Sequence, residues 1–432
     1  MKKLLILALA LASFIGTAAL AEDSYISGGF EASGNIVAGA GWQRFKTKAG
    51  NPTVFRDING NLPGVIGAYD TVGAGGGTTG GINRMDIFKF FVDQAELDLA
   101  KSFGENIRIR TDLNFGSNTM NGGNRFATGA GGGAATNVII EQAYATANMS
   151  VGNGLEFLLG RFNAPIGFEK VNVVYNDTIS HSVVYRALRP NTFTGAKFYY
   201  SFSDAVDWNI YVVNSGLSYD DGDTVTVNSD IPGAGTRLGF NWGEEGKKST
   251  LGFSGVYGQD HTATSGMKKH ISFLGDVDWQ WWVTDNFAFG GEGAFRQINS
   301  QTIGEKNAKY LGLLANLHYN FSDVWDGTLR YAFAKEFNNS VSSSGSLVTP
   351  VTAGAVQSLV GGYTAAGAGT SAAGKEDIHE ITLAGNYAIA DGAKLKLEGG
   401  YTLIMPSTQS TTGTGTEKEN VFGVAGAFAY EF

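Results

Sequence analysis

The sequence predicts an all-β fold: a transmembrane antiparallel β-barrel of about 16 strands, with short periplasmic turns and long extracellular loops. Three patterns support this prediction. Side chains alternate between apolar and polar along many segments, the connections alternate between short and long, and the tryptophans gather at one end of the predicted strands. Beyond the first 21 residues, no apolar run approaches the roughly 18 residues that a spanning helix needs, which argues against a helical membrane protein.

Alternation is clearest in residues 105–116, where apolar residues such as Ile107 are separated by polar ones such as Arg108. Residues 270–282 and 393–404 repeat this pattern. A side-chain period of two indicates a strand with one apolar and one polar face. A soluble sandwich would alternate in the same way, so the arrangement of the strands has to decide between the two folds.

That arrangement favours a membrane barrel. The predicted strands cover residues 26–44, 88–101, 105–116, 138–149, 154–162, 192–202, 206–214, 235–243, 250–258, 270–282, 286–297, 308–320, 325–335, 378–389, 393–404 and 420–432. Short turns alternate with long connections, as in transmembrane barrels. The even strand number leaves both termini on the same side.

Aromatic residues give an independent indication. Six of the seven tryptophans fall at strand ends beside short turns: Trp208, Trp242, Trp279, Trp281, Trp282 and Trp325. Tryptophan collects at membrane interfaces because its ring has an apolar body and a polar edge. The chain also ends in an alternating segment whose last residue is Phe432, similar to the final strand of bacterial outer-membrane barrels, where that end is read by the barrel assembly machinery.

Residues 1–21 resemble a cleaved signal peptide, with Lys2 and Lys3 before an apolar run and a small-residue cleavage site. The alternative is an uncleaved anchor helix, for which the apolar run is short. Residues 22–432 are then expected to form one barrel domain. That domain would carry 29 bases against 40 acids, an acidic balance that does not favour nucleic-acid binding. The chain has no cysteine, which excludes disulfides and thiolate metal sites.

If the apolar strand faces meet lipid, the polar faces line the lumen. The charged residues on the predicted lumen faces are Glu31, Glu96, Asp98, Asp112, Glu156, Asp207, Asp276, Asp278, Glu292, Glu380, Glu398, Arg108, Arg110, Lys197, Arg237, Arg296, Arg330, Lys394 and Lys396. Such a set would be costly in a dry core, so the lumen is expected to hold water. Some of these residues could instead pair structurally along the wall. Eleven acids against eight bases predict near-neutral to weakly cation-selective behaviour.

No catalytic or metal site is predicted, and no cofactor. Of the five histidines only His318 falls on a lumen face, with no nucleophile assigned beside it. Asp220, Asp221 and Asp223 lie close together in a connection, but the pattern is incomplete as a calcium loop and fits a solvated turn better. A Gly-rich loop with a phosphate-binding motif is also missing.

Residues 160–195 resemble the OmpL-like beta-barrel porin family. The resemblance rests on a Gly-Arg-Phe-x-x-Pro-x-Gly-x-Glu pattern followed by a Pro and a Gly: Gly160, Arg161, Phe162, Pro165, Gly167, Glu169, Pro190 and Gly195. It covers residues 154–214 well and the rest of the chain only by architecture. It implies an outer-membrane porin that passes small hydrophilic solutes, is surrounded by lipid and lipopolysaccharide, and forms a homotrimer.

In sixteen-stranded porins the third loop narrows the pore, so the resemblance implies that residues 163–191 form a constriction loop. The residues expected at the narrowing are Glu169, Lys170, Asp177, His181, Arg186 and Arg189. Alternatively, this loop caps the barrel or packs on a neighbouring subunit. Two other functions stay open: a surface receptor or adhesin that acts through its Gly-rich loops, and a barrel hydrolase that uses His318.

Overall fold

The computed structural model describes residues 25–26, 29–47, 84–115, 139–214, 231–244, 246–261, 270–299, 307–338, 355–357, 363–365, 376–406 and 419–432. The predicted signal peptide, the Gly-rich connections and the Asp220–Asp223 cluster lie outside these residues.

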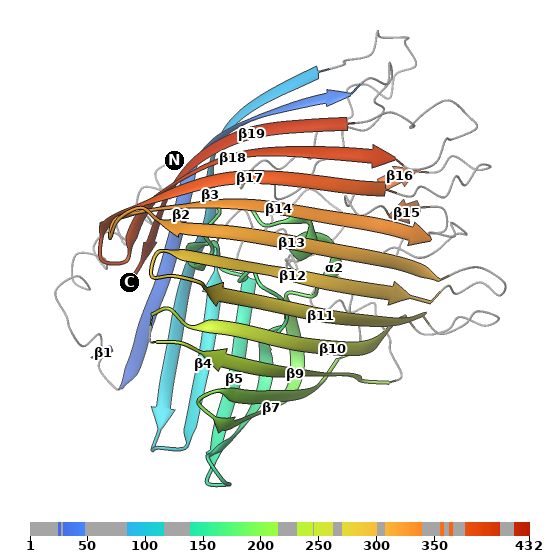
Figure 1. Ribbon diagram of the computed structural model, residues 1–432. Coiled ribbons are helices and arrows are strands. Elements are labelled where there is room, and N and C mark those ends of the chain that lie inside the picture. The colour runs from blue at the N-terminus through green and yellow to red at the C-terminus, as the bar shows by residue number, and fades with distance from the viewer. Residues whose placement is uncertain are drawn as a thin grey trace, which may run out of the picture.

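The described residues form a closed antiparallel barrel of sixteen long strands (Figure 1). These strands are β2 (Phe30–Thr47), β3 (Arg84–Phe103), β4 (Ile107–Asn114), β5 (Ile139–Met149), β6 (Leu155–Asn163), β7 (Thr192–Ser203), β8 (Val206–Val213), β9 (Gly233–Trp242), β10 (Ser249–His261), β11 (His270–Trp282), β12 (Phe287–Ile298), β13 (Ala308–Asn320), β14 (Trp325–Asn338), β17 (Glu376–Ala390), β18 (Ala393–Pro406) and β19 (Glu419–Glu431). Three short strands accompany them: β1 (Tyr25–Ile26), β15 (Ala355–Gln357) and β16 (Tyr363–Ala365). The prediction of sixteen strands is confirmed.

Each long strand pairs with its neighbours in the chain, and β19 pairs with β2 to close the barrel. Phe432 completes this seam: its amide donates to the carbonyl of Gly34, and the amide of Gly34 donates back, both at 3.0 Å. Pairing every strand on both sides leaves no open sheet edge, which a structure inside a bilayer requires. Tight turns join pairs of strands at one end of the barrel, for example β3 to β4 and β13 to β14 (Figure 1).

The two faces of the wall differ as the alternation predicts. On β11, Ser272, Asp276 and Asp278 are buried in the lumen, whereas Phe273 and Trp281 are exposed on the outside. The large apolar residues of the outer face are the ones that lipid covers in a membrane barrel.

Six of the seven tryptophans lie at the turn end of the barrel, as predicted, and Trp208, Trp242, Trp281 and Trp325 are exposed on the outside. Trp282 differs, because its ring packs edge-on against His318 on the lumen face. It follows Trp281 directly, so the alternation of the strand turns it inward.

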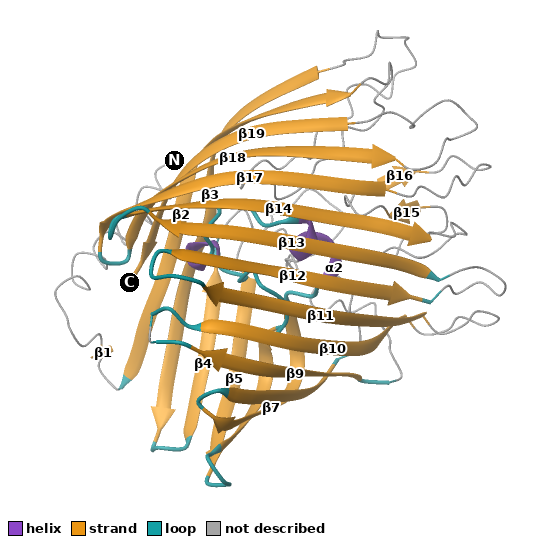
Figure 2. Cartoon of the chain, in the orientation of Figure 1, coloured by secondary structure: helices purple, strands orange, loops and turns teal. Residues whose placement is uncertain are grey.

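Two short helices lie within the ring of strands (Figure 2): the 3-10 helix η2 (Val173–Tyr175) and α2 (Val183–Leu188). Both belong to the connection between β6 and β7. Among the described residues, no helix is long and apolar enough to cross a membrane.

Candidate functional site: the loop inside the barrel

The connection between β6 and β7, residues 164–191, folds into the barrel and packs on the lumen side of the wall (Figure 1). We call it the inserted loop. Its stem continues the β6–β7 hairpin, because the amide of Ala164 donates to the carbonyl of Asn191 at 2.8 Å. Most of its side chains are buried, including Ile179 and Val184. The sequence left open whether this loop points inward, and the structure places it inward.

Three wall carboxylates hold the inserted loop by accepting hydrogen bonds from its backbone. Glu292 accepts from the amide of Phe168 at 2.8 Å, and Glu380 accepts from the amide of Val183 at 2.7 Å. Glu398 accepts from the amides of Ile179 and Ser180 at 2.6 and 3.0 Å. Amides in a loop have no ladder partner, so these acceptors satisfy groups that would be costly to bury alone.

Two basic residues of the wall also hold the loop, by donating hydrogen bonds to it. Arg330, on β14, donates to the Glu169 carboxylate at 2.5 Å, to the Thr178 hydroxyl at 2.7 Å and to the Ser180 carbonyl at 2.6 Å. Lys396, on β18, donates to the carbonyls of Val173, Asn176 and Thr178. Both bases are almost fully buried. A buried charge needs this number of partners to offset its desolvation.

The α2 segment adds apolar contact. Ser182 caps it, with its hydroxyl accepting from the amide of Tyr185 at 3.2 Å. Val184 and Leu188 then pack in one cluster with Leu314 of β13 and Ala332 of β14. Burying a valine or leucine contributes about 1.5–3 kcal/mol each. A helix of six residues would not persist alone, so its wall contacts stabilise it.

The other end of the inserted loop reaches β3 and the chain terminus. Asn172 donates to Glu96 at 3.0 Å, and the amide of Val173 donates to the side-chain oxygen of Gln94 at 3.2 Å. The Tyr175 hydroxyl donates to Glu431 at 2.8 Å. The loop therefore crosses the lumen from β12 to the strands beside the seam.

The Gly-Arg-Phe-x-x-Pro-x-Gly-x-Glu pattern forms the entry to the loop. Gly160 pairs with Gly195 across β6 and β7, and at its φ of 140° a Cβ atom would lie 2.2 Å from the carbonyl oxygen of Ala143. Gly167 has a φ of 82°, and a Cβ there would lie 1.9 Å from the guanidinium of Arg189. Both positions therefore require glycine for conformation and for space.

Replacing Gly167 with alanine is expected to loosen the entry to the loop. The methyl group would displace Arg189 from Glu292, its ion-pair partner at 3.4 Å. Alanine at this position would also have to adopt a strained backbone conformation, because the φ angle is positive. We expect faster proteolysis within residues 164–191 and a noisier single-channel current. Gly255→Ala is the control, because a Cβ there meets nothing within 4 Å. Equal protection of the G167A and wild-type loops would contradict this account.

The structure brings the six predicted constriction residues into one loop but gives them different surroundings. Glu169 pairs with Arg330, Arg186 with Glu380, and Arg189 with Glu292, and all these side chains are buried. His181 is also buried and stacks on Tyr185 at 3.9 Å. Asp177 is about one-third exposed beside His318. Lys170 is exposed. Four of the six thus fix the loop to itself or to the wall, a role that residue type alone did not reveal.

The pKa values in the loop follow from this burial. Burial alone would raise the pKa of Glu169, but Arg330, His181 and Ser182 lower it below its ordinary value. For Asp177, burial is likewise outweighed by His318 and Asn316, which lower its pKa. Burial lowers the pKa of His181 to about 4. The loop therefore holds two ionised carboxylates and a neutral histidine at neutral pH.

Acidification is expected to weaken the attachment of the loop in two steps. Burial depresses the pKa of His181 from 6.5 to about 4. A released loop therefore takes up a proton at a higher pH than the seated loop does, so the attachment of the loop weakens as pH falls from about 6.5 to about 4. Glu169 and Asp177 have depressed pKa values, so their contribution is lost only below about pH 4. Protease protection of the loop against pH would measure both steps. His181→Gln should remove the upper step alone, and an unchanged upper step in H181Q would exclude His181 as its source.

Several of the residues that the sequence assigns to the lumen face contact the inserted loop, among them Glu292, Arg330 and Lys396. Glu292, Arg296, Arg330, Lys396 and Glu398 are buried. Sequence reasoning missed several other buried polar residues, including Asp93 and Glu141. These two lie where the register shifts between β2 and β3 and between β4 and β5. A β-bulge adds a residue and breaks the period of two, so alternation could not place them.

Three of the lumen carboxylates, Glu96, Asp98 and Asp112, come within 4.8 Å of one another. Arg110 occupies the space a cation would take, because it donates to Asp112 at 2.6 Å and to Asp98 at 3.2 Å. Glu96 accepts from Gln94 at 2.6 Å. The cluster is an ion-pair and hydrogen-bond network of the wall.

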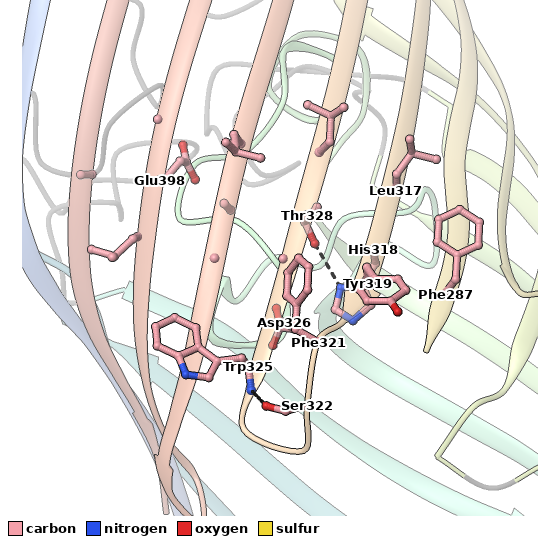
Figure 3. A pocket seen from close by; sticks show the side chains of 18 of the residues that line it. Phe287, Leu317, His318, Tyr319, Phe321, Ser322, Trp325, Asp326, Thr328 and Glu398 are labelled. Carbon is pink, nitrogen blue, oxygen red and sulfur yellow. Dashed lines mark hydrogen bonds between the residues drawn. The ribbon is translucent and has the colours of Figure 1, made fainter. Parts of the chain in front are cut away.

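His318 does not form a catalytic arrangement with its neighbours. Its Nδ1 atom lies 3.1 Å from the Thr328 hydroxyl (Figure 3). The same atom lies 3.5 Å from Asp177, and the Nε2 atom lies 3.0 Å from Asn320. In a triad the acid and the hydroxyl occupy opposite ring nitrogens, whereas here both approach Nδ1. His318 is a contact between the wall and the loop.

A cavity near this region runs along the wall of the barrel. It has a volume of about 870 Å³ and runs over β13, β14, β17, β18 and β19, with Leu317, Phe321 and Trp325 among its lining residues (Figure 3). Leu383 and Leu397, which also line it, are exposed outward. Gly327, Gly385 and Gly399 leave this part of the outer face without side chains. The lining of the cavity also includes residues of the lumen face, such as His318 and Glu398.

The comparisons with known proteins agree with this architecture. The family model described as "Putative beta-barrel porin-2, OmpL-like" matches residues 76–432. The chain belongs to this family. As a member it is a porin of the bacterial outer membrane, a channel for passive diffusion. The resemblance seen in residues 160–195 is thereby confirmed. No curated protein sequence matches this porin.

Solved structures similar to this porin share its fold. The outer membrane channel DcaP of Acinetobacter baumannii has 11% identity and a TM-score of 0.53, with 94% of this chain and 99% of that chain covered. An anion-selective porin from Comamonas acidovorans has 11% identity and a TM-score of 0.51, covering 93% and 100%. The outer-membrane protein OmpT of Vibrio cholerae has 10% identity and a TM-score of 0.50, covering 93% and 97%.

Proposed function

We propose that small hydrophilic solutes and ions pass through this porin between the inserted loop and the wall formed by β4 to β9. The polar contacts that hold the body of the loop come from β3, β12, β14, β17, β18 and β19, and its entry also meets β10, where Ser254 donates to the carbonyl of Pro165 at 3.5 Å. The lumen faces of β4 to β9 instead keep charged side chains that are only half-buried, among them Arg110, Lys197 and Arg237. A sixteen-stranded barrel is wide enough for a water-filled path beside such a loop.

The observation that carries this proposal is the fixed position of the loop on one side of the lumen. In this proposal residues 163–191 form the constriction, and the six loop residues from Glu169 to Arg189 act in two ways. Lys170 and Asp177 meet the solute, and the other four hold the loop in place. The charged residues of the wall likewise divide into those that face water and those that face the loop.

Reconstitution of the purified porin into planar bilayers tests the proposal. We expect stepwise current increases whose size is proportional to voltage, because a fixed loop leaves a permanent path. If the loop acted as a closed plug, the bilayer would carry no current even with a large amount of porin added. That result would contradict the proposal. The heat-denatured porin, added in the same detergent, is the control for detergent leakage.

The proposal extends to partners and chemistry. We propose that the porin forms a homotrimer among outer-membrane lipid and lipopolysaccharide, and that it performs no catalysis. The exposed apolar outer face suits a lipid environment. The barrel assembly machinery is proposed to read the terminal strand through Phe432, whose backbone completes the seam. Crosslinking in native membranes, followed by denaturing electrophoresis, would show whether three chains associate.

A further inference from the structure

In the passage beside the inserted loop, the basic partner of each ion pair is more exposed to the lumen than the acidic partner. Arg110 has a side chain that is 31% exposed, whereas its partners Asp98 and Asp112 are 11% and 0% exposed. Arg237 is 18% exposed and its partner Asp278 only 6%. Each pair is therefore a dipole with its positive end toward the water of the lumen.

Two lysines border the same passage, and the carboxylates that interact with them, Asp278 with Lys170 and Glu156 with Lys197, lie beyond ion-pair distance. The Lys170 side chain extends from the loop and is exposed, and the Lys197 side chain is half-buried on β7. Lys197 also lies 5.4 Å from the ring of Phe162, which leaves its ammonium group without a hydrogen-bonded partner. Across the described residues, neither ammonium group is within hydrogen-bonding or ion-pair distance of a carboxylate.

The acids at this depth are mostly out of reach of a passing ion. Those buried against the loop or within the wall are Asp93, Glu96, Glu141, Glu169, Asp276, Glu292, Glu380 and Glu398. Asp177 is about one-third exposed, but it lies against His318. The buried bases, such as Arg330 and Arg189, are equally removed from water.

The acids that do meet water lie at the periplasmic mouth. Glu156 and Asp207 are the second residues of β6 and β8, and Glu431 is the last residue of β19. Glu31, the second residue of β2, is 45% exposed and already paired with Arg108. Glu431 already accepts a hydrogen bond from the Tyr175 hydroxyl of the inserted loop at 2.8 Å. Glu156 and Asp207 lie beside the short turns, away from the body of the loop, so salt screens them from a passing ion.

From this layering we infer that the passage prefers anions and that Lys170 is the main determinant of this preference. The inference rests on the proposed function and names its solute class: small carboxylates, phosphates and inorganic anions. It runs against the count of eleven acids and eight bases on the wall, because a count ignores which groups face water. Oriented positive groups in a narrow low-dielectric path raise the local concentration of anions.

The test is the reversal potential of the reconstituted porin in a KCl gradient of about tenfold. The more concentrated side is kept near 0.1 M, where the screening length is about 10 Å. We expect a chloride-to-potassium permeability ratio above 1. Lys170→Gln should lower that ratio by about twofold or more, and Lys170→Glu should take it below 1. Lys248→Gln is the matched control, because Lys248 is exposed on the turn between β9 and β10 and should leave the ratio unchanged.

The outcomes separate the two proposals. A potassium preference in the wild-type porin would overturn the anion inference while leaving the channel intact. A chloride preference that K170E does not alter would overturn the role of Lys170. Absence of any conductance would overturn the proposed function itself. Protease protection of the loop in K170Q and K170E should match wild type, because the Lys170 side chain makes no contact that holds the loop.

Discussion

Removing the inserted loop should increase the single-channel conductance of this porin by about twofold or more, because a sixteen-stranded barrel without an obstruction holds a wide aqueous channel. The stem makes such a variant feasible. Ala164 and Asn191 face each other across the hairpin, joined by a backbone hydrogen bond of 2.8 Å. Replacing residues 165–190 with Asn-Gly would close β6 and β7 with a tight turn. Planar bilayer recordings at matched salt provide the measurement.

The control for this deletion is Tyr175→Phe, which removes only the hydroxyl that reaches Glu431. Its conductance should equal that of wild type. A deletion variant that conducts like the intact porin would show that the loop does not limit the current. The same deletion should also reduce the chloride preference, since it removes Lys170.

The largest effect of a single substitution is expected at Arg330. Replacing it with methionine leaves the Glu169 carboxylate, which is 3% exposed, without its cation partner. It also removes the donors to Thr178 and Ser180. Breaking a buried ion pair from one side costs about 3–5 kcal/mol. We expect the loop to leave its position, with rapid proteolysis between residues 168 and 188 and a conductance close to that of the deletion variant.

Two further variants separate the ion pair from general damage. Lys394→Met changes another lumen-facing base, but one that is exposed and makes no ion pair within the described residues, so its loop should stay protected. Adding Glu169→Gln to R330M removes the stranded charge and should restore part of the protection, as a coupled pair requires. If R330M alone keeps the loop fully protected, Arg330 does not hold it.

The barrel could be predicted from the sequence because its determinants are local. Alternation of apolar and polar residues, turn positions and the ring of tryptophans placed all sixteen strands within a few residues of their observed bounds. The failures also have local causes. Asp93 and Glu141 sit at register shifts, and a bulge cannot be read from a period of two.

The chemistry of the loop could be predicted only in part. The sequence showed that residues 163–191 hold mixed charge, but the partners of these charges come from strands more than 100 residues away. Glu169 meets Arg330, and Arg189 meets Glu292, in contacts that no short-range pattern encodes. Residue type therefore gave the same expectation for Lys170, which is exposed, and for Arg189, which is buried.

The seam between β19 and β2 sets an order of events during biogenesis. Gly34 and Phe432 bond across almost the whole length of the chain, and Glu398 bonds to Ser180 across 218 residues. Contacts with such separations form late, because each needs a large loss of chain entropy first. The first strands must therefore pair while the inserted loop still lacks its contacts with the later strands. Closing the ring and seating the loop become one final step, and a chain truncated before β18 can complete neither.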